Sequence, residues 1–180
     1  MKKFEQIYDL AEGNFGLVTF SEAKRHGVSI RELDRWVKDG RLERLSRGVY
    51  RIVRFSPSEY DSYAAAVESV GTDAYLCGES VIALLRLVPT NPSLMYVASP
   101  RRVRKHLGNG MVLVKGLPDY VYENYNGIRS QRLGDAIRSC RATVRPDRRI
   151  RAAKEGFRQG YLAKGEVSKL IREITNETSA

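Results

Sequence analysis

The pattern of apolar and polar positions predicts three helices at the start of the chain. An apolar stripe at i, i+3, i+4 and i+7 predicts the first, which Gly13 ends; the stripe is Phe4, Ile7, Tyr8 and Ala11. Leu17-Val18 is a candidate short strand. Thr19 with Glu22, and Ser29 with Glu32, have the spacing of capping boxes, which begin two further helices. Gly27 between them can take positive φ, as a tight turn requires, so this segment predicts a helix-turn-helix.

The second helix of this pair has two faces that suit DNA recognition. It is expected to run to about Asp39, before Gly40. Its apolar face is expected to point inward and consists of Ile30, Leu33, Trp36 and Val37. A separate basic face at i, i+4 and i+7 consists of Arg31, Arg35 and Lys38. A recognition helix needs one face to hold it on its domain and one to enter the major groove. The alternative is an ordinary surface helix with solvated arginines.

A basic hairpin is predicted directly after this helix. Two short strand-like segments, residues 41–45 and 49–52, flank a turn in which Gly48 can supply the special backbone conformation. Four arginines lie along the hairpin, namely Arg41, Arg44, Arg47 and Arg51, with Arg47 at its tip. A hairpin in this position is the wing of a winged helix-turn-helix, and its tip can contact phosphate or the minor groove.

The rest of the chain predicts a second, α/β domain. Ser56-Pro57-Ser58 is the expected linker, so we expect domains at residues 1–56 and 57–180. Strands are predicted at 74–77, 94–98, 111–114 and 120–123, with another extended piece from Gly127, and helices at 59–70, 81–87 and 133–140. Gly108-Asn109-Gly110 is expected to form a hairpin turn. The predicted fold class is therefore α+β: an N-terminal winged helix-turn-helix and a small mixed α/β C-terminal domain.

Two amphipathic helices are predicted at the C-terminus, separated by a break at Lys164-Gly165. Their apolar stripes are Ile150, Ala153, Phe157 and Tyr161 in the first, and Val167, Leu170, Ile171 and Ile174 in the second. Each of these faces must be buried against the second domain or against a partner.

Net charge adds a polyanion-binding expectation to this picture. The chain has 31 Lys and Arg against 21 Asp and Glu, for a net charge of +10. Residues 1–56 carry +4 of it and residues 129–180 carry +7, while the middle is nearly neutral. A second basic surface is expected to comprise Arg101, Arg102, Arg104, Lys105, Arg138, Arg141, Arg145, Arg148, Arg149 and Arg151. Solvated loop and helix arginines are the plain alternative.

Candidate catalytic and metal chemistry is sparse. Two histidines cannot build a histidine-rich metal centre, and Cys77 and Cys140 have no neighbouring ligands, so both are expected to be buried thiols. Two carboxylate pairs could belong to a nuclease, but neither precedes a strand-borne lysine; they are Asp73 with Glu79 and Asp119 with Glu123. We therefore expect no enzyme activity, metal or cofactor. The sequence shows neither a signal peptide nor a membrane-length apolar run, so a cytoplasmic protein is expected.

The order of these parts resembles the AbiEi-family antitoxins. The N-terminal motifs that carry the resemblance are Gly16-Leu17-Val18-Thr19, Ala23, Gly27-Val28-Ser29, Leu33, Val37, Gly40-Arg41-Leu42-Glu43-Arg44 and Arg47-Gly48-Val49-Tyr50. Looser similarity covers residues 78–85, 94–98, 127–128, 132–136 and 161–167. The chain departs from the family pattern at Gln131, where the family usually has Thr or Ser.

The resemblance implies a bacterial type IV toxin–antitoxin antitoxin, with a role in phage defence. Its winged helix would repress its own operon at promoter repeats in double-stranded DNA, and a monomer could occupy each repeat. Its C-terminal domain would counteract a nucleotidyltransferase-like toxin. The implied groove-reading positions are Ser29, Arg31, Glu32 and Arg35, and the implied wing contacts are Arg44, Arg47 and Arg51. Two alternatives remain open: a nuclease-like C-terminal domain, or an interaction module that binds a toxin directly.

Overall fold

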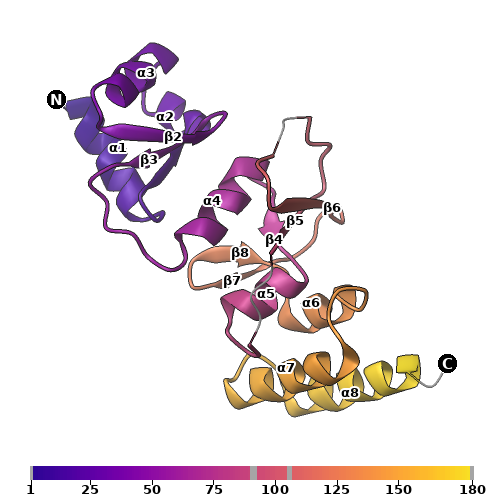
Figure 1. The fold of residues 1–180 in the computed structure, drawn as a ribbon. Helices are drawn as coiled ribbons and strands as arrows, with labels where there is room; N and C mark the ends of the chain where they lie inside the picture. The colour runs from indigo at the N-terminus through magenta and orange to yellow at the C-terminus, as the bar shows by residue number, and fades with distance from the viewer. Residues whose placement is uncertain (1, 90–92, 105–106, 179–180) are drawn as a thin grey trace. The chain divides into compact units, whose positions relative to one another are not determined.

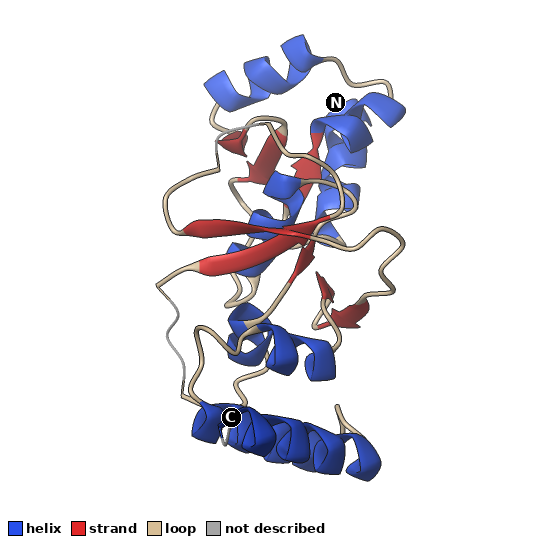
Figure 2. Ribbon diagram, turned by 90° about the vertical axis from the view of Figure 1, so that its right-hand side faces the viewer, coloured by secondary structure: helices blue, strands red, loops and turns tan. Residues whose placement is uncertain are grey.

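The chain folds as two compact units. The computed structural model describes residues 2–89, 93–104 and 107–178 (Figure 1). The first unit comprises Met1–Thr72 with Val103–Leu107, and the second comprises Asp73–Arg102 with Gly108–Ala180. Helices and strands occur in both units (Figure 2). The predicted α+β class is confirmed.

The first unit has the elements of a winged helix-turn-helix in the predicted order. Three helices and a three-stranded antiparallel sheet, in the order β1-β3-β2, make up its core. The elements are α1 (Lys2–Glu12), β1 (Leu17–Thr19), α2 (Phe20–Arg25), α3 (Ile30–Lys38), β2 (Leu42–Ser46) and β3 (Val49–Ile52). Both predicted capping boxes are present, and Gly27 takes φ +72° at the turn between α2 and α3.

The apolar core of this unit explains why α3 is held in place. Leu33 is fully buried and Trp36 is 4% exposed, and the Trp36 ring meets the edge of the Phe4 ring at a centroid distance of 5.0 Å. The expectation that Ile30 faces inward is wrong, since this side chain is 42% exposed. Ile30 is the first residue of α3, and it lies outside the cluster of buried side chains that includes Leu33 and Trp36.

A fourth helix extends the first unit past the expected linker. The sequence places the boundary after residue 56, whereas α4 (Asp61–Val70) packs against β2 and β3 within the first unit. A hydrogen bond of 3.0 Å from the Ser46 hydroxyl to the Ser69 hydroxyl joins β2 to α4. The first segment of this compact unit therefore ends at Thr72.

The second unit contains a five-stranded mixed sheet in the order β6-β5-β4-β8-β7. Its strands are β4 (Tyr75–Leu76), β5 (Met95–Ser99), β6 (Met111–Lys115), β7 (Glu123–Tyr125) and β8 (Ile128–Ser130). Because β5 and β6 are parallel, the expected hairpin turn at Gly108-Asn109-Gly110 is wrong. The strand predicted at 120–123 instead covers Glu123–Tyr125.

The helices of this unit are α5 (Glu79–Leu84), α6 (Leu133–Ser139), α7 (Pro146–Arg158) and α8 (Lys164–Thr178). The break between α7 and α8 lies near Gly160, at φ +84°, rather than at Lys164-Gly165. Phe157 and Tyr161 are 47% and 37% exposed, so the apolar stripe expected for α7 is only partly buried. Gly156 is buried instead, and a Cβ there would lie 2.5 Å from a terminal methyl of Leu133 in α6, which would have to move.

Arg149 is a core residue, which corrects its expected place on a basic surface. Its side chain is 1% exposed. Its Nε donates to the carbonyl oxygen of Ile137 at 2.9 Å, and its Nη1 donates to the Glu177 carboxylate at 2.7 Å. One guanidinium therefore connects α6, α7 and α8.

Replacement of Arg149 is expected to destabilise the second unit strongly. Arg149→Ala leaves a cavity and an unpaired Ile137 carbonyl, at a cost of about 3 kcal/mol. Arg148→Ala is the matched control, since Arg148 is exposed, and its effect should stay within about 0.5 kcal/mol. Urea unfolding followed by circular dichroism measures both. Trp36 fluorescence serves as a reference, because the only tryptophan of the chain lies in the first unit. Equal stability of the two variants would contradict the structural role of Arg149.

Candidate nucleic-acid interface

The start of α3 is fixed by a carboxylate that accepts several hydrogen bonds. Glu32 accepts from the Ser29 backbone N–H at 2.8 Å, while the Glu32 backbone N–H donates to the Ser29 hydroxyl at 3.3 Å. These bonds, with the Ser29 backbone contributing most and Lys3 next, lower the pKa of Glu32 from 4.5 to about 2. Ser29 and Glu32, expected to read the groove, are thus both used in the cap of α3.

Lys3 is a positioning residue that the sequence analysis missed. Its Nζ donates to the carbonyl oxygen of Gly27 at 2.8 Å and to the Glu32 carboxylate at 3.0 Å. This ammonium connects α1 to the turn and to the cap of α3. No motif marks it in the sequence, because its partners are 24 and 29 residues away.

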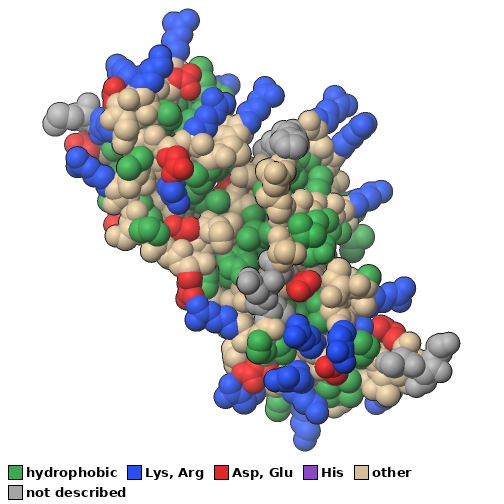
Figure 3. Space-filling view, viewed as in Figure 1, with side chains coloured by type: hydrophobic (Ala, Val, Ile, Leu, Met, Phe, Trp, Pro, Cys, Tyr) green, Lys and Arg blue, Asp and Glu red, His purple; other side chains and the backbone are tan. Residues whose placement is uncertain are grey.

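The basic face of α3 is open to solvent. Arg31, Arg35 and Lys38 are all exposed, and among the residues that the structure describes none of them is in an ion pair. They lie on the side of α3 away from Leu33 and Trp36, which are in the core. Lys and Arg side chains project from the surface around α3 in Figure 3. The arrangement offers three cationic groups at successive turns of one helix.

The tip of the wing is held against the start of α2. Gly48 takes φ +80° in the turn between β2 and β3, and its carbonyl oxygen accepts a 2.8 Å hydrogen bond from the Phe20 backbone N–H. The register of the hairpin shifts between Arg44 and Ser46, which marks a bulge just before the turn. Arg47 at the tip is exposed and, within the described parts of the chain, has no ion pair.

The other arginines of the wing have partners inside the unit. Arg51 pairs with Glu43 across the two strands at 2.5 Å. The Arg41 guanidinium lies 3.4 Å from the centroid of the Phe4 ring, and that of Arg44 lies 5.9 Å from the Tyr50 ring. Five of the nine expected contact positions are therefore used in contacts within the unit: Ser29, Glu32, Arg41, Arg44 and Arg51. The other four have no ion pair, stacked ring or cap among the described residues: Arg31, Arg35, Lys38 and Arg47.

The expected second basic surface is dispersed over several elements and partly neutralised. Arg101 pairs with Asp73 at 2.6 Å, Arg145 with Asp147 at 3.1 Å, and Arg138 with Glu173 at 2.8 Å. The members that are exposed and have no ion pair among the described residues are Arg102, Arg104, Arg141, Arg148 and Arg151. Arg149 is buried, and Lys105 lies outside the described residues.

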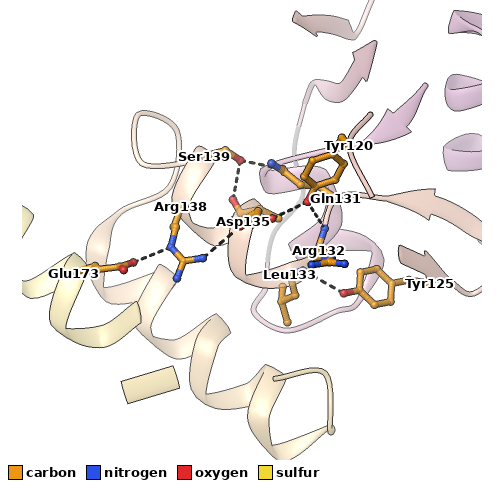
Figure 4. A network of polar contacts seen from close by, with 10 residues as sticks. Tyr120, Tyr125, Gln131, Arg132, Leu133, Asp135, Arg138, Ser139 and Glu173 are labelled. Atoms are coloured by element: carbon orange, nitrogen blue, oxygen red, sulfur yellow. Dashed lines mark hydrogen bonds and ion pairs between the residues drawn. The ribbon is translucent and has the colours of Figure 1, made fainter. Parts of the chain in front are cut away.

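A polar network organises the start of α6 in the second unit (Figure 4). The Tyr120 hydroxyl accepts from the Arg132 backbone N–H at 3.0 Å and donates to Asp135 at 2.7 Å. Gln131 accepts from the Gly78 backbone N–H at 3.0 Å and from the Ser139 hydroxyl at 3.1 Å. Gln131 therefore connects the segment after β8 to the start of α5 and to the end of α6.

The second unit shows little that points to metal or redox chemistry. Cys77 and Cys140 are free and buried as expected, and burial raises the pKa of each thiol to about 12. Within the described residues, no group of three or more His, Cys, Asp or Glu could hold a metal ion.

None of the described helices is both long enough and apolar enough to cross a membrane.

Comparison with protein families bears directly on the first unit. Residues 5–53, which run from α1 to the residue after β3, match the family model described as transcriptional regulator, AbiEi antitoxin. Residues 5–53 form an AbiEi antitoxin domain. The family is one of transcriptional regulators, for which DNA is the implied partner. No curated protein matches the chain.

Loss of the α3 cap is expected to destabilise the AbiEi domain without removing a cation. Ser29→Ala removes the side-chain acceptor of the Glu32 backbone N–H, which should cost about 1 kcal/mol. Ser56→Ala is the control, because Ser56 is exposed and lies in a loop. Urea unfolding monitored by Trp36 fluorescence reports the change. A Ser29→Ala domain as stable as the control would show that the cap contributes nothing.

The Glu32 carboxylate is expected to make this domain sensitive to acid. A pKa lowered from 4.5 to about 2 stabilises the folded state fully above pH 4.5, and this contribution is lost as the pH falls from 4.5 towards 2. The Glu32→Gln variant should therefore show a flatter dependence of stability on pH in that window. Trp36 fluorescence in urea at a series of pH values tests this. Parallel curves for the two proteins would contradict it.

Proposed function

We propose that this protein is a DNA-binding autorepressor that grips its own promoter repeats with α3 and the wing. The observation that carries the proposal is that Arg31, Arg35, Lys38 and Arg47 are exposed without ion pairs among the described residues. Cationic side chains that are exposed in this way give up no ion pair with the described residues when they bind a phosphate or a base. The AbiEi match of the same residues supports the assignment.

Each element has a distinct part in the proposed complex. The basic face of α3 enters the major groove, where Arg31 and Arg35 reach guanine O6 and N7 or the flanking phosphates. Arg47 at the wing tip contacts phosphate or the minor groove. Arg41, Arg44 and Arg51 hold the shape of this surface through their contacts with Phe4, Tyr50 and Glu43. A monomer occupies each repeat.

We further propose that the protein is the antitoxin of a bacterial type IV toxin–antitoxin system that acts in the cytoplasm, with a role in phage defence. Its second unit would counteract a nucleotidyltransferase-like toxin without a cofactor or an enzymatic step of its own. The antitoxin description of the matched family supports this proposal. The separate core of the second unit fits a role distinct from DNA binding.

The DNA contact is tested by titrating labelled promoter DNA at several salt concentrations. The Arg31→Ala/Arg35→Ala variant should bind at least about tenfold more weakly. If both groups contact phosphates, the slope of log K against log salt should fall by about 1.8 in magnitude. The Arg31→Lys/Arg35→Lys control keeps the charge and loses bidentate base recognition, so it should lower the preference for promoter over shuffled DNA. Unchanged affinity of the alanine variant would overturn the proposed interface.

The wing offers a matched pair of arginines. Arg47→Ala should weaken promoter binding more than Arg51→Ala does, because Arg51 is already paired with Glu43. The reverse order would place the wing contact away from its tip.

For the antitoxin role, the protein is co-expressed with the product of the neighbouring gene, and growth is measured. Growth arrest that the unaltered protein fails to relieve would contradict antitoxin activity.

A further inference from the structure

The two edges of the five-stranded sheet differ in how they are protected. At one edge, β7 is three residues long and carries Glu123 and Asn124 as exposed polar side chains. At the other edge, β6 is five residues long and apolar over its first four residues, with Leu113 39% and Val114 38% exposed. An exposed apolar edge strand is a template for pairing with another strand, which proteins commonly blunt with charge or short length.

The backbone of β6 has hydrogen-bonding groups directed away from the sheet. Met95 N–H donates to the Gly110 carbonyl, and Gly116 N–H donates to the Ser99 carbonyl, which fixes the register with β5. Because the direction of backbone groups alternates along a strand, Leu113 and Lys115 present their N–H and C=O groups to the open edge. The backbone N–H and C=O groups of the alternate residues, which include Val114, form the hydrogen bonds of the ladder with β5.

A pocket opens beside this edge, on one face of the sheet. Its volume is about 280 Å³, and Val114, Lys115 and Leu117 line it from β6 and the segment that follows. Tyr75, Tyr96 and Tyr120 supply aromatic walls, and Tyr75 stacks on Tyr120 at a centroid distance of 4.9 Å. Glu79 adds a carboxylate to the lining. A cavity of this kind suits one aromatic side chain with a hydrogen-bond donor at its tip.

Exposed apolar side chains continue past the pocket, and positive charge lies at the same end of the sheet. Leu117 and Val121 are each 64% exposed. Hydrophobic side chains gather over β5 and β6 in Figure 3. Lys115 at the end of β6 is opposite Ser99 at the end of β5, so Arg102, three residues after Ser99, leaves the sheet at this end. Both cations are exposed and lack an ion pair within the described segments.

We propose that the β6 edge binds an extended, acidic segment of a partner protein as an added strand, with one aromatic side chain of that segment in the tyrosine-walled pocket. Backbone hydrogen bonds to Leu113 and Lys115 supply affinity, and the pocket supplies specificity. Carboxylates of the segment face Lys115 and Arg102. A second copy of this chain fits less well, because an antiparallel pair of β6 edges centred on Leu113 places Met111, and no carboxylate, opposite Lys115.

The test uses the full chain and synthetic peptides. The probe is a labelled peptide of about eight alternating glutamate and valine residues with one central tyrosine, the length of a typical strand. One control peptide carries lysine in place of glutamate, and another carries N-methyl groups on alternate backbone nitrogens. Fluorescence anisotropy measures binding, and gel filtration with light scattering measures the oligomeric state.

Two matched protein variants separate backbone from side-chain effects. Leu113→Pro removes an outward N–H and no bond of the ladder, so it should weaken binding about tenfold relative to Leu113→Ala. Thr143→Trp, at the exposed rim of the pocket, should block the tyrosine anchor. Circular dichroism checks that each variant is folded. Promoter binding should be unchanged in all of them, which keeps this test independent of the DNA-binding proposal.

The outcomes divide cleanly. Binding of the acidic peptide that is weakened in Leu113→Pro, in Thr143→Trp and in the N-methyl control supports the proposed site. Absence of binding at about 1 mM peptide, the weak limit of specific recognition, overturns it. Binding that Leu113→Pro leaves intact also overturns it. A dimer that Leu113→Pro dissociates would assign the edge to a second copy of the chain and overturn the proposed partner.

Discussion

The proposed DNA-binding surface of this protein is organised around the Glu32 carboxylate. It closes the cap of α3 through Ser29 and receives the Lys3 ammonium, which at the same time holds the turn at Gly27. One acidic side chain thereby joins α1, the turn and α3. Together with the burial of Leu33 and Trp36, this junction sets the direction in which the basic face of α3 points. The low pKa of Glu32, about 2, follows from the same contacts and keeps the junction charged at all physiological pH values.

Charged residues in this chain cannot be sorted into surface and core by type alone. Arg31 and Arg51 are both arginines of the AbiEi domain, but Arg51 is held by Glu43 and Arg31 has no ion pair among the described residues. In the second unit, Arg149 is buried within the helices and Arg148, its neighbour, is exposed. The functional meaning of each cation therefore comes from what it touches, and a count of positive charges overstates the available surface.

Local signals were sufficient to predict most of the first unit from the sequence. The capping boxes, the glycine turns and the hairpin depend on residues within a few positions of each other, so Ser29 with Glu32 and Gly48 could be interpreted directly. Contacts between distant segments could not. The parallel pairing of β5 with β6, the burial of Arg149 against Ile137 and Glu177, and the contact of Lys3 with Gly27 all join residues at least 12 positions apart. Exposure of Ile30 was missed for a related reason, since helical spacing does not say how far the core extends along a helix.

The hydrogen bond between Phe20 and Gly48 has a consequence for the proposed binding of the domain to a duplex. It joins the turn between β2 and β3 to the first residue of α2. The backbone of Arg47 at the wing tip therefore belongs to the same rigid unit as α2 and α3. A tip anchored in this way has little conformational entropy left to lose on association. The domain should approach its target preorganised, with the spacing between its two contact elements set before the encounter.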